Sequence, residues 1–214
     1  MTTVKALVVN ADFNAGYNKA LIRQCCEWCD VLALVEAKDF KVAEFLPAGW
    51  TSLQDTSSEA EAGSCLAVNT AKATIDESYL ILGCDEPKGG GMLRRYIAVA
   101  ECHEVATGKQ FAPMAYHWPP ERYQKECGPQ FTENIQGAWT NNKTRRPVAG
   151  CDANMPIAKM ADKLQNAKGY GTEVMGWCVW KGDTIKVTDT VVRGGVETEG
   201  WSDHPGYQIN LEIS

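Results

Sequence analysis

A series of short apolar segments constrains the fold more than any other feature of this sequence. Each segment is too short for a typical helix and stops at a polar or turn-forming residue, which is typical of buried strands of about four to eight residues. The expected strands are Val4–Val9, Val31–Val35, Ser64–Val68, Tyr79–Leu82, Tyr96–Ala100, Phe111–Tyr116, Arg146–Gly150, Gly176–Trp180, Thr184–Val192 and Tyr207–Ile213. So many strands do not fit a simple doubly wound sheet, and they favour two packed sheets.

Helical segments separate several of these strands. Asn18–Cys29 places Leu21 and Cys25 on one face of a helix, and it lies between the first two strands. This β-α-β order predicts that those two strands are parallel neighbours. The other expected helices are Glu121–Trp139 and Pro156–Ala167. We therefore predict an α/β fold, a four-layer sandwich of two mixed β-sheets flanked by helices, in one domain spanning residues 1–214.

Composition and charge narrow the classes of function. The chain has 214 residues and a net charge of 21 − 27 = −6, which argues against binding nucleic acid over its whole surface. A small basic rim or a bound metal ion would still hold a single phosphate. No apolar run is long enough to cross a bilayer, and the N-terminus has no signal-peptide pattern. We therefore expect a cytoplasmic protein with no membrane partner.

The nine cysteines are expected to be free thiols, because nothing in the sequence indicates export. Cys26 and Cys29 form a C-x-x-C pattern, but no second Cys or His pair has the spacing of a zinc site. Buried cysteines on a helix face are the favoured interpretation, and a structural zinc ion is the alternative.

Polar residues recur directly after apolar strands. Asn10, Glu36 and His117 each follow such a strand, and Asp152 and Asn154 follow another. Ligands gather at the carboxyl ends of strands in sheets that are flanked by helices, so these side chains could converge on one site. An antiparallel last strand would begin at the same edge, which would bring in the residues that precede Tyr207.

The residue types at these positions suggest chemistry on a phosphate ester. Asn10, Glu36 and Asp203 offer only oxygen ligands, which Mg²⁺ and Mn²⁺ prefer and zinc does not. His117 and His204 are able to hydrogen-bond a phosphate or protonate a leaving oxygen near neutral pH. Taken singly, each such residue is more often a cap, a turn or a solvated side chain. The functional interpretation depends on the whole set occurring together.

The order of these motifs resembles the endonuclease/exonuclease/phosphatase superfamily, the DNase I-like phosphohydrolases. The resemblance runs from Leu7 to Ile213, essentially the whole chain. The segments that carry it are Leu7–Asn10, Asp30–Asp39, Gly63–Val68, His117–Pro120, Val148–Asn154 and Ser202–His204. Two positions depart from the family pattern, since Val35 replaces the usual Gln and Cys151 the usual Gly. Cys151 is expected to place its sulfur beside the metal site.

The resemblance implies a role for each matching residue. Asn10, Glu36 and Asp203 would bind the divalent metal, Mg²⁺ or Mn²⁺. Asp152 would orient or deprotonate the attacking water, and Asn154 would hold a phosphate oxygen.

Further roles fall to the two histidines and to neighbouring charges. His204 would stabilise the charge that develops on the scissile phosphate, and His117 would be the second catalytic histidine. Lys38 lies where some members place a phosphate-contacting Arg. Asp183 resembles the family's aspartate that orients the last histidine, although Asp189 competes for this role.

These roles describe a divalent-metal-dependent phosphodiester hydrolase, and an endo- or exonuclease acting on DNA is the first choice. Nucleic acid is the expected substrate because basic residues cluster in Asn141–Arg146 and at Arg94 and Arg95, although ordinary solvated charge explains both clusters equally well. The alternative is a phosphatase or phosphodiesterase acting on a small-molecule or lipid phosphate ester, which the acidic net charge favours. A binding module without catalysis is a third hypothesis.

Overall fold

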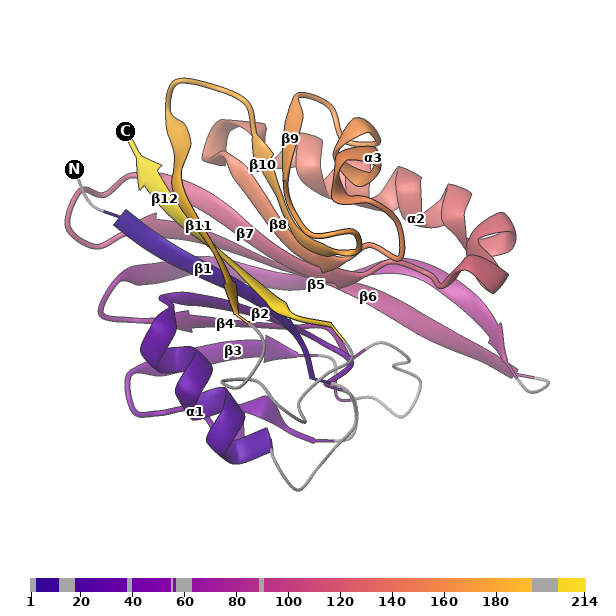
Figure 1. The fold of residues 1–214 in the computed structure, drawn as a ribbon, viewed down its shortest axis with the longest axis horizontal. Helices are drawn as coiled ribbons and strands as arrows, with labels where there is room; N and C mark the ends of the chain where they lie inside the picture. Colours follow the sequence, from indigo (N-terminus) through magenta and orange to yellow (C-terminus); the bar gives the residue numbers. More distant parts are fainter. Residues whose placement is uncertain are drawn as a thin grey trace.

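Two six-stranded β-sheets pack face to face in this protein, with helices on both outer faces (Figure 1). The structure is a computed structural model that describes residues 3–11, 18–37, 40–54, 56, 63–88, 91–193 and 204–214. In the first sheet the strands run in the order β11-β12-β1-β2-β4-β3, and in the second the order is β5-β6-β7-β8-β10-β9. The predicted four-layer sandwich of two mixed sheets is therefore confirmed.

The first sheet contains the β-α-β unit that opens the chain. Its strands are β1 (Thr3–Asn10), β2 (Val31–Val35), β3 (Trp50–Gln54), β4 (Cys65–Asn69), β11 (Ile185–Arg193) and β12 (Gly206–Ile213). Helix α1 (Asn18–Trp28) joins β1 to β2, and these two strands pair in parallel as predicted. Strand β12 pairs antiparallel with the other edge of β1, so it begins where β1 ends.

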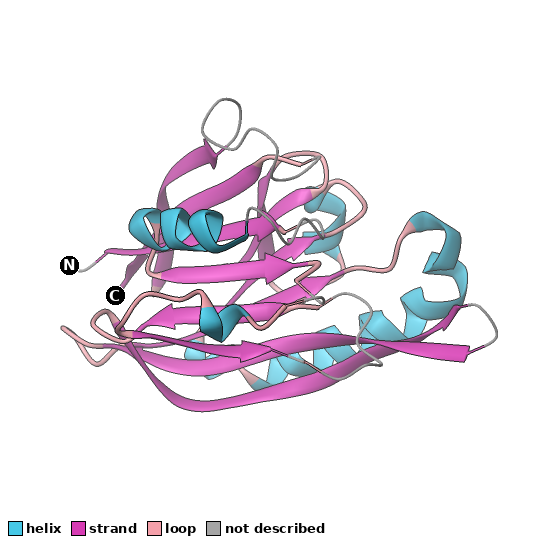
Figure 2. Ribbon diagram, turned by 90° about the horizontal axis from the view of Figure 1, so that it is seen from below, coloured by secondary structure: helices cyan, strands magenta, loops and turns pink. Residues whose placement is uncertain are grey.

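The second sheet is built around the parallel pair of β7 and β8. Its strands are β5 (Ala73–Lys88), β6 (Gly91–Glu104), β7 (Gln110–His117), β8 (Pro147–Asp152), β9 (Ala167–Gly171) and β10 (Met175–Trp180). Helix α2 (Glu121–Asn141) connects β7 to β8 and runs beside the long β5–β6 hairpin, which reaches past the neighbouring strands (Figure 2). The short elements are α3 (Ile157–Asp162), η1 (Val42–Glu44) and η2 (Lys143–Arg145).

Three apolar clusters hold the four layers together. The central cluster lies between the sheets and includes Ala33 and Trp177. A second cluster packs α2 and α3 on the outer face of the second sheet, and a third packs α1 on the outer face of the first. All nine cysteines are free and buried, as expected for packing residues, and Cys25, Cys26 and Cys29 belong to the cluster under α1.

The described part of the chain forms twelve strands, whereas the sequence predicts about ten. Strand β3 was not expected, and the predicted helix Pro156–Ala167 is wrong beyond Asp162 because β9 begins at Ala167. Strand β9 has a weak strand pattern because it includes two glycines. A Cβ at Gly169 would lie 2.7 Å from Cγ2 of Ile157, so only glycine lets α3 approach this closely. No helix in the described ranges is long and apolar enough to cross a membrane.

The topology directs the ends of β1, β2, β7 and β8 and the starts of β4, β10 and β12 to the same edge of the sandwich. Strands β1 and β2 end there with Asn10 and Val35 as partners, and β7 and β8 end there with His117 and Asp152 as partners. Strand β12 starts at this edge with Gly206, two residues after His204. The predicted convergence of polar strand ends therefore follows from the two parallel pairs, and the antiparallel strand β12 adds His204.

Candidate active site at the carboxyl ends of the central strands

Asn10 links the two sheets at this edge. Its Nδ2 donates a hydrogen bond to Oε1 of Glu36 at 3.1 Å and another to Oδ2 of Asp152 at 3.3 Å. The bond to Glu36 lies within the first sheet, and the bond to Asp152 crosses to the second. Asn10 and Asp152 are almost fully buried. The amide therefore holds two carboxylates at close range in a place with little water to screen them.

His117 completes a compact group with these carboxylates. Its Nδ1 lies 3.6 Å from Oε1 of Glu36, and its Nε2 lies 4.0 Å from Oδ2 of Asp152. One ligand atom from each of Glu36, His117 and Asp152 falls within 4.8 Å of the other two, so this trio could hold a metal ion. Burial lowers the pKa of His117 well below its usual value, and the charges of Arg95 and His204 lower the pKa further. The imidazole is therefore neutral near pH 7, the form that binds metal ions.

Asn154 sets the tautomer of His117. Its Nδ2 donates to the carbonyl oxygen of Trp118 at 2.9 Å and lies 3.0 Å from Nε2 of His117. Since the second amide hydrogen points at Nε2, that nitrogen accepts, and the ring proton is assigned to Nδ1 on the side of Glu36. The backbone N–H of Asn154 also donates to Oδ1 of Asp152 at 3.1 Å. Asn154 is thus in contact with two of the predicted catalytic groups.

Left-handed backbone conformations occur at two residues of the site. Glu36 has φ 60° and Asn154 has φ 46°. Such angles are uncommon for residues other than glycine and cluster at functional sites, where the surrounding structure maintains them. Here they turn the chain sharply at the ends of β2 and β8, which keeps both side chains at the sheet edge.

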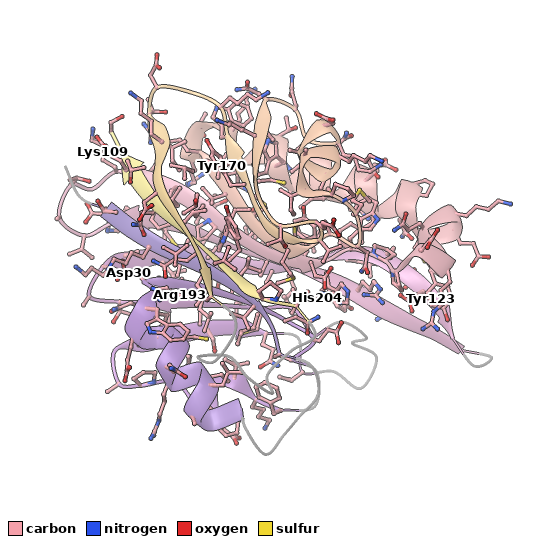
Figure 3. All side chains as sticks on the ribbon, in the orientation of Figure 1. Asp30, Lys109, Tyr123, Tyr170, Arg193 and His204 are labelled. Carbon is pink, nitrogen blue, oxygen red and sulfur yellow. The ribbon has the colours of Figure 1, made fainter. Side chains whose placement is uncertain are left out.

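His204 lies at the mouth of the site. Its Nε2 is 3.9 Å from Oδ2 of Asp152, and its side chain is about one-third exposed, whereas His117 is buried (Figure 3). Six predicted residues therefore come together: Asn10, Glu36, His117, Asp152, Asn154 and His204. The predicted ligand Asp203 and the predicted phosphate contact Lys38 lie outside the described residues, so their roles stay predictions.

Asp183 does not join this group, and its expected role in orienting His204 is wrong. Strand β10 starts at the site, where Met175 pairs with Asp152, and it runs away to the opposite edge. Asp183 follows it in a turn there, and its backbone carbonyl accepts a hydrogen bond from Oγ of Ser214 at 2.8 Å. Strand β12 begins at the site and ends beside Asp183. It is eight residues long, so these two edges of the sheet are about 27 Å apart. The competing Asp189 pairs with Asn210 within the sheet and is also remote.

The basic segment Asn141–Arg146 also lies away from the site. It precedes β8, so it occupies the edge at which that strand begins, whereas Asp152 ends the strand. Nη2 of Arg145 is 3.0 Å from Oε2 of Glu101, and Nη1 of Arg146 donates to the carbonyl oxygen of Gln110 at 3.0 Å. These cations therefore stabilise the fold and do not form the expected rim for nucleic acid.

Arg95 is a buried neighbour of the site that sequence reasoning placed on the surface. It forms an ion pair with Glu86, and both side chains are buried. Its charge contributes to the low pKa of His117. Arg94 is partly exposed and lies 3.6 Å from Asp85. The alternation of side chains along β6 could have indicated that two adjacent arginines face opposite sides.

Two residues next to the predicted catalytic positions, Trp118 and Cys151, are buried in the apolar cluster under α2 and α3. Trp118 is buried and packs against Phe131, with ring centroids 5.1 Å apart, so it is a core residue. The sulfur of Cys151 was expected beside the metal site, which is wrong. Cys151 belongs to the cluster under α2 and α3, because successive side chains of β8 alternate between the two faces and Asp152 takes the inner one.

The fold and this cluster together define a DNase I-like architecture with a carboxylate–histidine centre between its sheets. No protein-family model matches the sequence, and no curated protein matches it either. Solved structures do match over the full chain. An endonuclease/exonuclease/phosphatase from Bacteroides vulgatus has a TM-score of 0.79 at 15% identity, with 100% of each chain covered.

Two other similar structures differ in what they act on or bind. TDP2 from D. rerio, complexed with a single-strand DNA product, has a TM-score of 0.74 at 12% identity and covers 100% of both chains. A mannosyl-6-phosphatase from Bacteroides thetaiotaomicron has a TM-score of 0.72 at 14% identity, with 98% of this chain and 100% of that chain covered. The chain therefore has the fold of the endonuclease/exonuclease/phosphatase proteins that its motifs resemble.

Proposed function

We propose that this protein is a divalent-metal-dependent phosphoric ester hydrolase that cleaves phosphodiesters in nucleic acid, with DNA as the first substrate to test. The observation that supports it best is the convergence of Glu36, His117 and Asp152 from three strands, with ligand atoms within 4.8 Å of one another. Carboxylates and a neutral histidine at a strand-end cleft are a frequent arrangement for metal-assisted hydrolysis.

The donor set fits Mg²⁺ or Mn²⁺. Asn10 and Glu36 supply oxygen ligands at the meeting point of the sheets, and Asp203 would supply a third. Nδ1 of His117, which carries the ring proton, is buried without a hydrogen-bond partner among the described residues and faces Glu36, so this N–H would orient the carboxylate that holds the ion. A bound divalent ion would neutralise charge on the phosphoryl oxygens and on the leaving oxygen.

The protein side chains would share the remaining work. Asp152, held by Asn10 and Asn154, would orient the attacking water and accept its proton. Asn154 and Lys38 would hold phosphate oxygens. His204, at the exposed mouth, would stabilise the charge that develops on the scissile phosphate. The buried His117 would assist proton transfer at the leaving oxygen.

A phosphatase or phosphodiesterase acting on a small-molecule or lipid phosphate ester is the second candidate. The likeness to a mannosyl-6-phosphatase supports it, as does the net charge of −6. The position of the Asn141–Arg146 segment at the opposite edge also removes one reason for preferring nucleic acid. The likeness to TDP2 bound to single-strand DNA product supports the first candidate.

Cleavage of supercoiled plasmid and of short single- and double-stranded DNA, with Mg²⁺, Mn²⁺ or EDTA, tests the proposal. We expect metal-dependent cleavage that falls about a hundredfold or more in His204→Ala, because removing one group that stabilises developing charge typically costs that much. His103→Ala is the matched control, since His103 is an exposed histidine bonded to Asp76. A folded His204→Ala protein with full activity would contradict the assignment, and cleavage of phosphate monoesters alone would favour the second candidate.

A further inference from the structure

A groove on the outer face of the second sheet opens directly beside the candidate active site. It lies between the first turns of α2 and the short helix α3, and it has a volume of about 530 Å³. Its lining residues are Gln124, Met155, Pro156, Lys159, Asp162 and Lys163. None of these residues belongs to the carboxylate–histidine cluster, so the cluster and the groove are separate features of the surface.

Asn154 connects the groove to the cluster. On one side its Nδ2 lies 3.0 Å from Nε2 of His117, and on the other its carbonyl oxygen accepts a hydrogen bond from Nε2 of Gln124 at 3.4 Å. The left-handed turn at Asn154 leads from Asp152 to Met155, which lines the groove. A ligand that contacts Asn154 is therefore able to continue into the groove without leaving the protein surface.

Two lysines make the groove cationic. Lys159 and Lys163 are four residues apart, so they project from neighbouring turns of α3 and its C-terminal end, about 6 Å apart along the axis. Nζ of Lys163 lies 5.4 Å from the ring centroid of Trp118, the residue after His117. Neither ammonium group forms a salt bridge within the described ranges, and Asp162 supplies the one carboxylate among the lining residues.

This local charge runs against the composition of the chain. The net charge of the whole protein is −6, whereas the lining residues carry two positive charges and one negative. A positively charged surface next to a catalytic cleft attracts anions and raises their local concentration. The basic residues of Asn141–Arg146 lie at the opposite edge, where Arg145 is paired with Glu101 and Arg146 is bonded to Gln110, so they are too far away to serve this purpose.

We propose that this groove binds the nucleic-acid strand beyond the scissile phosphate, with Lys159 and Lys163 each contacting one further phosphate. The proposal rests on the proposed function as a phosphodiester hydrolase and specifies its substrate as a polyanionic strand. Lysine contacts with phosphates are independent of sequence and position the strand. A phosphate monoester of a small molecule would not reach the groove. Binding in the groove therefore distinguishes the two candidate functions.

Binding of fluorescein-labelled eight-nucleotide single strands, measured by anisotropy in EDTA, tests the groove without any need for turnover. Single-stranded DNA and RNA of the same sequence are compared, because both carry the same phosphates. The double variant Lys159→Ala/Lys163→Ala should raise the Kd about tenfold or more at low salt. Its slope of log K against log salt should be shallower by about 1.4, because each lost contact to a single strand removes about 0.7.

Lys109→Ala is the matched control, because Lys109 is an exposed lysine in the turn before β7, at the edge opposite His204 (Figure 3). It should bind the strand as the wild type does. Lys159 is exposed, and an electrostatic contact with phosphate should weaken more when this lysine is replaced by glutamate (Lys159→Glu) than when it is replaced by alanine (Lys159→Ala). If the double variant is folded by circular dichroism and retains the wild-type Kd and salt slope for both strands, the groove proposal is refuted.

Turnover provides the second measurement. In the wild type with Mn²⁺, kcat/KM should rise as the substrate lengthens from two to eight nucleotides, and this rise should shrink at least fivefold in the double variant. An undiminished rise would contradict the groove. The wild type could bind the strand more tightly than the double variant does and still cleave no phosphodiester with any metal. That result would refute the proposed function and leave the groove proposal standing.

Discussion

Replacing Gly150 with alanine should destabilise the protein at the point where the two sheets carry the site. Gly150 lies on the inner face of β8, two residues before Asp152. A Cβ there would lie 2.8 Å from Cβ of Ala33 and 2.9 Å from Cη2 of Trp177, well inside ordinary van der Waals contact. Neither neighbour is free to retreat, because both are fully buried and Nε1 of Trp177 is bonded to the carbonyl oxygen of Tyr207 at 2.9 Å.

The expected magnitude follows from the overpacking. An added methyl group in a well-packed core lowers the free energy of unfolding by about 1–3 kcal/mol. For a protein of this size, that corresponds to a fall in Tm of about 2–12 °C. Because the added methyl group pushes the sheets apart beside Asp152, we also expect catalysis to fall more than stability alone would explain. Urea unfolding at 25 °C, followed by fluorescence, gives the free energy directly.

Two companion variants make this prediction refutable. Ala33→Gly combined with Gly150→Ala removes one of the two close contacts, so the double variant should recover part of the lost free energy. Gly137→Ala is the control, because a Cβ at Gly137 meets nothing within 4 Å and alanine favours a helix by up to about 1 kcal/mol. A Gly150→Ala protein as stable as the wild type would refute the reasoning about sheet packing.

The remaining predictions concern the metal, pH and the thiols. Adding Mg²⁺ or Mn²⁺ at a hundred times its Kd should stabilise the wild type by about 2.7 kcal/mol and Glu36→Gln by much less, measured by thermal unfolding; equal shifts would place the ion elsewhere. Because the pKa of His117 is lowered in the folded state, the unfolded chain binds the extra proton below pH 6.5. Stability should therefore fall by up to about 1.4 kcal/mol between pH 7.5 and 5.5 relative to His117→Asn, and a parallel pH dependence of the two proteins would contradict this. Burial raises the pKa of Cys26 and of Cys102 to about 12, so a thiol reagent at pH 8 should label no cysteine until the protein unfolds, and rapid labelling of the native protein would contradict the buried placement.

Several residues of the candidate site could be predicted from sequence because each of them ends a recognisable local pattern. Asn10 and His117 each close an apolar strand, and Asp152 closes another, so the polarity change marks the strand end. Parallel pairing of β1 with β2 followed from the helix between them. Arg95 was misjudged, because its burial depends on a partner, Glu86, that lies on another strand of the hairpin.

Asp183 shows a second limit of sequence reasoning. Its motif is short, and the pattern of apolar residues along a strand reports burial without reporting direction. Whether the turn after β10 lies at the site or at the opposite edge depends on that strand pairing antiparallel with β8. The sequence pattern is the same in either case, so the correct edge is visible only in the assembled sheet.

The sequence by itself determined ten of the twelve described strands, the positions of the three helices, the apolar faces and the chemical character of the candidate site. Those properties are local, because they depend on the side-chain period and on where the polarity changes along one segment. Tertiary structure alone decided which edge each turn occupies, which charges are paired, and that Lys159 and Lys163 line a groove beside Asn154. These features depend on contacts between segments far apart in the chain, and no single segment contains that information.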